Sequence, residues 1–158
     1  MGRAIGSRWN MTEPEPLWQC PRCGHLFVTK NRWHSCTKVE LDESFARSSP
    51  EMRSLFDRLL EKVQECGPVI VIPQKTRIAM QVLVRFMNVM PRKDHLVVEF
   101  WFTEEQHDPR FFKVEKYANR TYGHFVRLEN ETDLDEEFKG WICTSYRIGE
   151  RKHMSTAP

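Results

Sequence analysis

The chain has 158 residues, of which 40 % are hydrophobic and 29 % are charged, and its formal net charge is +2. That length suits one compact domain with a small appendage, and no apolar run reaches the roughly 20 residues of a membrane-spanning helix. Since the N-terminus also lacks the apolar stretch of a secretory signal, we expect no membrane association and a cytoplasmic location.

The most informative segment follows a polar leader, which we place over residues 1–17. It reads WQCPRCGHLFVTKNRWHSC and covers residues 18–36. Its spacing is C-x2-C-x10-H-x-C, formed by Cys20, Cys23, His34 and Cys36. Three cysteines and one histidine are ligands that Zn²⁺ takes in a tetrahedral site. Four protein ligands leave no position for water, so we predict a structural zinc site that holds residues 18–40 together.

Local features of this segment support the zinc interpretation. Two residues between Cys20 and Cys23 let one tight turn direct both sulfurs to one point, and Gly24 suits the positive φ of such a turn. His25 competes with His34 as a ligand, although its place directly after Gly24 suits the outer shell better. A redox C-x-x-C motif begins a helix after a strand, whereas this one follows a proline-rich leader. Free structural cysteines would leave the His-x-Cys half unexplained.

The two remaining cysteines stand apart from this cluster. The total of five is odd, which argues against a disulfide framework. Cys66 ends a helical pattern and Cys143 lies inside another. We expect both to be small buried apolar side chains.

A helix and two strands are predicted in the first half of the domain that follows. After an extra turn over 41–46, apolar residues recur at helical spacing from Met52 to Val63. Ser49 is the expected N-cap, Pro50 suits the first turn, and Gly67 with Pro68 ends the helix. Strands are predicted over residues 69–72 and 77–89.

The second half continues with strands and closes with a helix. Strands are predicted over 95–103, near 112–117 and over 124–128, and residues 90–94 form a turn. A last helix is predicted from about 133 to 147, with Thr132 as its N-cap and Gly149 at its end, before a tail over 150–158. Residues 41–149 therefore form an α+β domain: an antiparallel β-meander with helices packed on one face. The strand faces that contain Ile78 and Leu96 supply the apolar surface for the helices.

The other face of the predicted sheet combines arginine, glutamate and tryptophan. It carries Gln81, Arg85, Glu99, Trp101 and Arg127, so it suits a shallow cleft in which arginine binds an anion and tryptophan stacks on a flat ligand. The alternative is a purely structural Arg85–Glu99 cross-strand pair shielded by Trp101.

Two loops add basic groups. Lys75 and Arg77 lie between strands, in a loop without the glycines of a phosphate-binding loop. Residues 107–128 gather basic groups beside aromatic rings, which suits nucleic acid but is also common on sheet rims. The candidate ligand-binding residues are Lys75, Arg77, Gln81, Arg85, Glu99, Trp101, Arg110, Arg120, Tyr122, His124 and Arg127.

Charge is distributed unevenly along the domain. Residues 67–128 contain ten Lys/Arg and six Asp/Glu, whereas residues 129–150 contain two and seven. We expect the basic and acidic parts to attract each other, in preference to forming a field that steers a ligand.

Several motifs together carry a family resemblance. They are CPRCGHLFVTKNRWHSC, VIPQKTRIAMQVLVRF, PRK, HDPRF, YGHFVRL and DLDEE. The chain resembles an uncharacterised bacterial family whose C-terminal domain of unknown function is here preceded by a Cys3His zinc motif. Similar domains are appended to so-called predicted transport proteins. The resemblance covers about residues 18–148 and implies an α+β fold, but it implies no activity and assigns no catalytic residue.

Three functions are compatible with these observations. The first is a zinc-stabilised binding module for nucleic acid or another anionic partner. The second is an enzyme or small-molecule receptor that uses the face around Arg85, Glu99 and Trp101, although no nucleophile–base pair, catalytic metal motif or glycine-rich cofactor loop is evident. The third is a protein-interaction adaptor, in which Trp9 and Trp18 beside the leader contact the partner.

Overall fold

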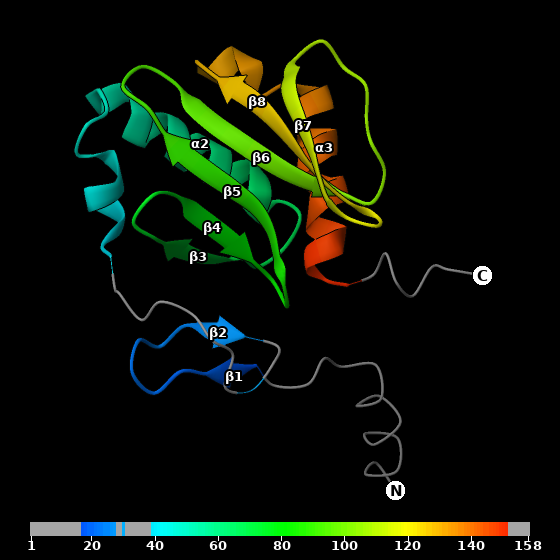
Figure 1. Cartoon of the computed structure of the whole chain (residues 1–158). Helices are drawn as coiled ribbons and strands as arrows, with labels where there is room; N and C mark the ends of the chain where they lie inside the picture. The colour runs from blue at the N-terminus through cyan, green and yellow to red at the C-terminus, as the bar shows by residue number, and fades with distance from the viewer. Residues whose placement is uncertain (1–16, 28–29, 31–38, 152–158) are drawn as a thin grey trace, which may run out of the picture.

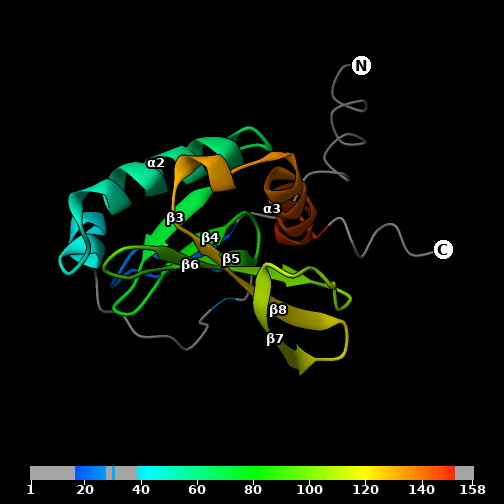
Figure 2. The same ribbon diagram turned by 90° about the horizontal axis from the view of Figure 1, so that it is seen from above.

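A computed structural model describes residues 17–27, 30 and 39–151 of the chain. The predicted leader up to residue 16, the tail from residue 152, and the predicted zinc ligands His34 and Cys36 lie outside the described residues. The described part is an α+β fold in which two helices cover one face of an antiparallel sheet (Figures 1 and 2). The predicted α+β class, antiparallel sheet and placement of the helices are therefore confirmed.

The elements follow one another in a simple order. The N-terminal part contains β1 (Trp18–Gln19), β2 (Leu26–Phe27), the 3-10 helix η1 (Leu41–Phe45) and α2 (Pro50–Gln64). The six strands of the main sheet are β3 (Ile70–Pro73), β4 (Ile78–Gln81), β5 (Arg85–Pro91), β6 (Leu96–Phe102), β7 (Phe111–Ala118) and β8 (Thr121–Leu128). The 3-10 helix η2 (Glu131–Asp133) and α3 (Glu136–Gly149) complete the domain.

Helix α2 forms where the apolar periodicity predicts it. It begins after the predicted N-cap Ser49, and Pro50 occupies the first turn. Its inward positions Met52, Leu55, Phe56, Leu59 and Val63 are buried against the sheet. Burying one such side chain contributes about 1.5–3 kcal/mol, so this face holds α2 on the sheet.

The sheet is not the continuous meander that we predicted. The strand order is β3-β4-β5-β6-β8-β7, so β8 lies between β6 and β7. β8 pairs with β6 from Leu96–Leu128 to Phe102–Tyr122, and β7 is the edge strand beyond it. The loop between β6 and β7 lets the chain pass the position of β8 before the β7–β8 hairpin returns to fill it.

The predicted strand over residues 77–89 was wrong, because these residues form two antiparallel strands. β4 ends at Gln81 and β5 begins at Arg85, and these two residues are partners in the register. The turn between them contains no glycine or proline. Instead, the backbone N–H groups of Leu83 and Val84 donate to the carbonyl oxygen of Gly149, at 2.9 and 3.1 Å. The end of α3 thus supplies the acceptor that this turn needs.

Helix α3 begins later than predicted. Its N-cap is Asp135 and not Thr132, because the Asp135 carboxylate accepts a hydrogen bond from Phe138 N–H at 2.9 Å. Thr132 belongs to η2, which is capped by Asn130. The helix ends at Gly149 as predicted.

The N-terminal hairpin packs against the main domain. The side chain of Gln81 donates to the carbonyl oxygen of Leu26 at 2.9 Å, and the guanidinium of Arg85 lies 5.8 Å from the centre of the Phe27 ring. Gln81 is only 2 % exposed. The β1–β2 hairpin is therefore joined to the β4–β5 end of the sheet.

Neither helix in the described part of the chain has the length and the apolar composition of a membrane-spanning segment.

Candidate functional site: the open face of the sheet

The sheet has one face that neither α2 nor α3 covers, and we call it the open face (Figure 2). The alternation along β4, β5, β6 and β8 places several of the predicted residues on it, including Gln81, Glu99, Trp101 and Arg127. These residues do not form one cluster. The β1–β2 hairpin contacts the β4–β5 end, a buried carboxylate occupies the middle, and a basic and aromatic region lies on β7 and β8.

The centre of the open face is a closed network around Glu99. Glu99 is 1 % exposed. Its two carboxylate oxygens accept hydrogen bonds from the Asn88 side-chain amide at 3.0 Å and from the Tyr117 hydroxyl at 2.5 Å. In the register Glu99 stands opposite Asn88 and Phe125, whereas Arg85 stands opposite Gln81. Within the described residues the ion pair Arg85–Glu99 does not occur, and neutral donors hold the carboxylate instead.

Gly123 makes room for this network. A Cβ atom at this position would meet the Glu99 carboxylate and lie 2.7 Å from Cε2 of Tyr117. The Tyr117 hydroxyl reaches the Glu99 carboxylate across Gly123, which has no side chain to block it. Burial, followed by the hydrogen bond to Glu99 and the negative charge there, raises the pKa of Tyr117 above its ordinary value. The hydroxyl therefore stays protonated and donates to Glu99.

Trp101 lies beside Tyr117, with their ring centres 6.3 Å apart. Its indole Nε1 is buried, and no acceptor among the described residues is within hydrogen-bond distance. On the helix side of the sheet, the Ser145 hydroxyl of α3 accepts from the Trp101 backbone N–H at 3.3 Å and donates to the Phe86 carbonyl at 2.5 Å. Ser145 thus bridges β5 and β6 where their ladder ends.

The β7–β8 end of the open face is basic and aromatic. Phe112 and Tyr117 are the large hydrophobic residues that the described part of the chain exposes, at 53 % and 47 %. The Arg127 guanidinium lies 5.7 Å from the Phe112 ring centre, and the Lys113 ammonium lies 5.0 Å from that of Phe125. Both cations are exposed, and Lys113 also pairs with Glu115 at 3.5 Å.

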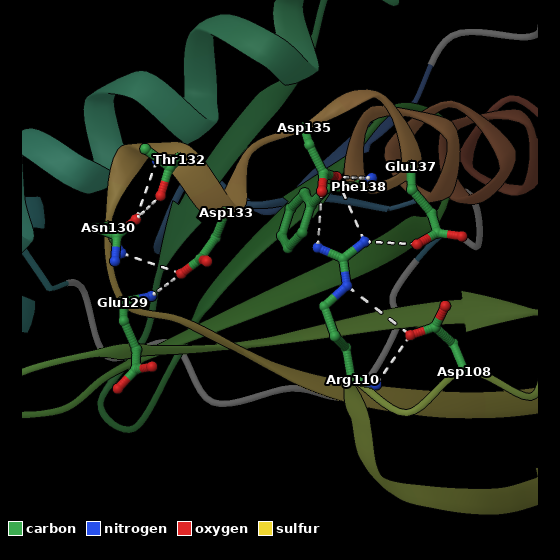
Figure 3. Close-up of polar contacts among 9 residues, drawn as sticks. All are labelled: Asp108, Arg110, Glu129, Asn130, Thr132, Asp133, Asp135, Glu137 and Phe138. Atoms are coloured by element: carbon green, nitrogen blue, oxygen red, sulfur yellow. Dashed lines mark hydrogen bonds and ion pairs between the residues drawn. The ribbon is translucent and has the colours of Figure 1, made fainter.

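Arg110 is held elsewhere, by acids from the end of the domain (Figure 3). Its guanidinium donates to Asp135 at 3.2 Å and to Glu137 at 2.8 Å, while its backbone N–H donates to Asp108 at 2.9 Å. It also lies 4.6 Å from the Trp141 ring centre. The basic and acidic parts of the domain meet here, as their charges predict. Because nearby carboxylates already pair with Arg110, its guanidinium is poorly placed to bind an anionic ligand.

His124 lies in the core and not on the surface. It is fully buried, and its Nε2 accepts from Gln106 N–H at 2.8 Å. The other ring nitrogen then carries the proton and faces the Tyr122 carbonyl at 3.3 Å. Burial lowers the pKa of His124, so the ring is neutral and does not contact an anion at the surface.

The remaining predicted residues lie apart from the centre. Lys75 and Arg77 are exposed in the loop between β3 and β4, at the far side of the sheet from β7. Arg120 is exposed at the turn of the β7–β8 hairpin, where its φ is 63°. The ring of Tyr122 lies 5.7 Å from the Lys116 ammonium.

Half of the predicted zinc site lies within the described residues. Cys20 and Cys23 are both buried and stand on one turn, closed by a hydrogen bond from Gly24 N–H to the Cys20 carbonyl at 2.8 Å. Gly24 has a φ of 80°, the positive value that its place in the motif predicts. Two adjacent buried thiols suit one side of a tetrahedral zinc site. Among residues 17–27, 30 and 39–151, no group of three or more possible metal ligands is found.

Sequence reasoning missed five residues of the open face: Asn88, Phe112, Lys113, Tyr117 and Gly123. Gly123 carried a usable signal, because a glycine inside a strand pattern often marks a close approach of another group. The other four depended on the register of β5 with β6 and on the position of β8, which local patterns do not define.

The comparisons place the main domain in a family. Residues 41–149 match the family described as Domain of unknown function (DUF5655). The match begins at the first residue of η1 and ends at the last residue of α3, so it includes the whole sheet and both helices. The chain belongs to this family. Comparisons with curated proteins and with solved structures find no significant match.

Proposed function

We propose that this chain is a zinc-stabilised binding module that holds single-stranded nucleic acid on the β7–β8 end of its open face. The observation that carries the proposal is the pair of exposed aromatic side chains, Phe112 and Tyr117, on a strand with basic neighbours. The zinc segment has a separate role, which is to stabilise the opposite end of the sheet.

The aromatic pair favours a single strand over a duplex. Phe112 and Tyr117 are five residues apart on β7, which corresponds to about 16 Å along a strand. Exposed rings at such a distance suit stacking on bases several nucleotides apart. Bases in a duplex are already stacked and do not offer their faces to a flat surface, so a duplex gains only phosphate contacts.

The local charge supports an anionic ligand. From Phe111 to Leu128 the chain has four basic residues and a single acidic one, Glu115. Lys113, Arg120 and Arg127 are exposed there. Phosphate contacts of this kind supply affinity without sequence preference and make binding depend on salt.

The zinc site rests on the ligand pattern and on the geometry of its first half. The buried Cys20–Cys23 turn supports two of the four ligands, and His34 and Cys36 complete the set in the sequence. Because four ligands close the coordination sphere, the ion has a structural role. The contacts Leu26–Gln81 and Phe27–Arg85 connect the segment to β4 and β5, far from β7 in the strand order.

The test of nucleic-acid binding is fluorescence anisotropy with labelled single-stranded and duplex oligonucleotides at several salt concentrations. We expect the single strand to bind more tightly. The double variant Lys113→Gln/Arg127→Gln should weaken binding and lower the slope of log K against log salt by roughly 1–1.5, since each phosphate contact contributes about 0.7.

A matched control removes the same charge elsewhere. Arg58 lies in α2 and Arg47 in the turn before it, and both are exposed. Since α2 covers the other face of the sheet (Figure 2), Arg47→Gln/Arg58→Gln should leave the slope near the wild-type value. The variant Phe112→Ala should weaken single-strand binding by roughly 5- to 150-fold at unchanged slope, because stacking on one ring contributes about 1–3 kcal/mol. Equal losses in both double variants, or equal affinity for duplex and single strand, would contradict the proposal.

The zinc content of the purified chain tests the proposed zinc site. The purified chain should contain one equivalent of zinc, and Cys20→Ser, His34→Ala or Cys36→Ser should remove it. Cys143→Ser is the matched control, since it changes a thiol outside the motif and should keep the metal. Zinc loss should loosen the β1–β2 hairpin yet leave oligonucleotide affinity largely intact. Full zinc retention in Cys36→Ser would show that the ligand set is wrong.

A second candidate function is a small-molecule site beside Trp101. The buried Nε1 without a described acceptor is the observation in its favour, because such groups are rare unless a ligand or water satisfies them. Glu99 argues against a catalytic role, since both oxygens are already bonded. Titration with small carboxylates and phosphates, followed by tryptophan fluorescence in wild type and Trp101→Phe, distinguishes this candidate. A change that Trp101→Phe fails to remove comes from another tryptophan and excludes the site.

A further inference from the structure

Two cysteines outside the zinc motif lie in contact, although the sequence placed them alone. Cys66 follows the last turn of α2, and Cys143 lies within α3. Their sulfur atoms are 2.7 Å apart, across a separation of 77 residues. A disulfide bond measures about 2.05 Å, so a small movement brings the two sulfurs to bonding distance.

The backbone around Cys66 is held in place on both sides. Lys139 of α3 pairs with Glu65, and the Tyr146 hydroxyl of α3 donates to the Pro68 carbonyl at 2.6 Å. Residues 139, 143 and 146 are four and three positions apart, so they share one face of α3. The segment after α2 therefore runs along this face, and the two thiols are its middle contact.

The thiol pair is open to a small reagent. Both cysteines are partly exposed, whereas Cys20 and Cys23 are buried. We expected buried apolar side chains, and the two thiols are instead partly buried, with Cys66 packed against the core. Within the described residues, no third metal ligand joins them, so the pair does not have the composition of a second zinc site.

We infer that Cys66 and Cys143 form a reversible disulfide by exchange with a low-molecular-weight disulfide. The thiolate of one cysteine attacks a sulfur of the small disulfide, whose S–S bond breaks and releases one small thiol. The sulfur of the second cysteine then attacks the protein-side sulfur of the mixed disulfide, and the second small thiol leaves. The protein loses two electrons and two protons, and the small disulfide gains both.

The environment sets the rate of this exchange. Burial, with the hydrogen bond and charge of Cys143, raises the pKa of Cys66 to about 12. Lys139 acts in the opposite direction but more weakly. The thiolate form of Cys66 is therefore scarce at neutral pH, and exchange through Cys66 should become faster as the pH is raised.

The bond would close a large loop. Residues 66–143 contain all six strands of the main sheet, so the crosslink restricts most of the unfolded domain. It would fasten α2 to α3 on the helix side of the sheet, away from the open face. The oxidised domain should be more stable than the reduced one, with unchanged access to β7 and β8.

The test uses the full zinc-loaded chain equilibrated with oxidised or reduced glutathione, then alkylated and digested with trypsin. Cleavage after Lys62, Lys75, Lys139 and Arg147 gives peptides 63–75 and 140–147. Oxidised glutathione should link these two peptides, with a mass lower by two hydrogens than their sum. An excess of reduced glutathione should separate them again.

Stability and variants complete the test. The melting temperature of the oxidised chain should exceed that of the reduced chain by roughly 5–15 °C, and Cys66→Ser or Cys143→Ser should abolish both the link and the shift. Three outcomes would each overturn the inference: Cys66 and Cys143 both alkylated after oxidation, glutathione adducts without the link, or a link that reduced glutathione fails to open. Because the wild-type chain gives the main readout, a variant that folds poorly leaves the test valid.

Discussion

The substitution Gly123→Ala tests the network at the centre of the open face. A Cβ atom at Gly123 would overlap the Glu99 carboxylate and lie 2.7 Å from Cε2 of Tyr117. Gly140 offers the same substitution without this cost, because it is exposed in α3 and has no atom within 4 Å of its Cβ position. The two variants add the same methyl group to the same chain.

The expected effects have opposite signs. At Gly123 the new methyl group overpacks a filled space, which costs about 1–3 kcal/mol. It also separates Tyr117 from a buried carboxylate, and a hydrogen bond to a charged group contributes about 1.5–3 kcal/mol. We expect Gly123→Ala to lower the free energy of unfolding by roughly 3–5 kcal/mol. Gly140→Ala should raise it by about 0.5–1 kcal/mol, since alanine is the better helix former.

Urea unfolding followed by circular dichroism measures both free energies. Tryptophan fluorescence adds a local readout, because Trp101 lies beside Tyr117. The variant Tyr117→Phe removes the hydroxyl and keeps the ring, so it should reproduce only the hydrogen-bond part of the loss. A Gly123→Ala variant within about 1 kcal/mol of wild type would show that Glu99 and Tyr117 do not make this contact in solution.

Three further changes test other contacts. Ser145→Ala removes the hydroxyl that bridges β5 and β6 and should cost about 1–3 kcal/mol in urea unfolding; a neutral result would exclude the bridge. Burial lowers the pKa of His124, so the unfolded chain binds a proton there that the folded chain does not. The stability from this site is therefore complete above about pH 6.5 and falls as the pH decreases below it, and His124→Gln should lack this part of the dependence of melting temperature on pH. Asp135→Ala should cost about 1 kcal/mol and Asp135→Asn less, because asparagine can still cap α3; equal losses in thermal melts would assign the effect to the ion pair with Arg110.

The elements built from local information were predictable. The apolar period from Met52 to Val63, with Ser49 and Pro50 before it, is sufficient to define α2, because helix contacts join residues three and four positions apart. The alternation around Leu96 likewise defines β6, because successive side chains of a strand point to opposite faces of the sheet. The Cys20–Cys23 turn and the positive φ of Gly24 also follow from a few adjacent residues.

The open face was predictable only in its composition. Glu99 and Trp101 lie on it as expected, but the partners of Glu99 are Asn88 and Tyr117. Asn88 arrives through the register of β5 with β6, and Tyr117 through an edge strand that lies beyond β8. A pattern of alternating residues states which face a side chain takes and not which strand stands beside it.

The sequence by itself determined the α+β class, the two helices, most of the strands and the Cys20–Cys23 turn of the predicted zinc site, since each depends on residues close together in the chain. Only the tertiary structure divided residues 77–89 into two strands, because the acceptor for their turn is the carbonyl of Gly149. The tertiary structure also paired Arg110 with Asp135 and Glu137, and it placed Cys66 beside Cys143. In each case the deciding partner is distant in sequence, and only the packing of α3 against the sheet and against α2 brings it near.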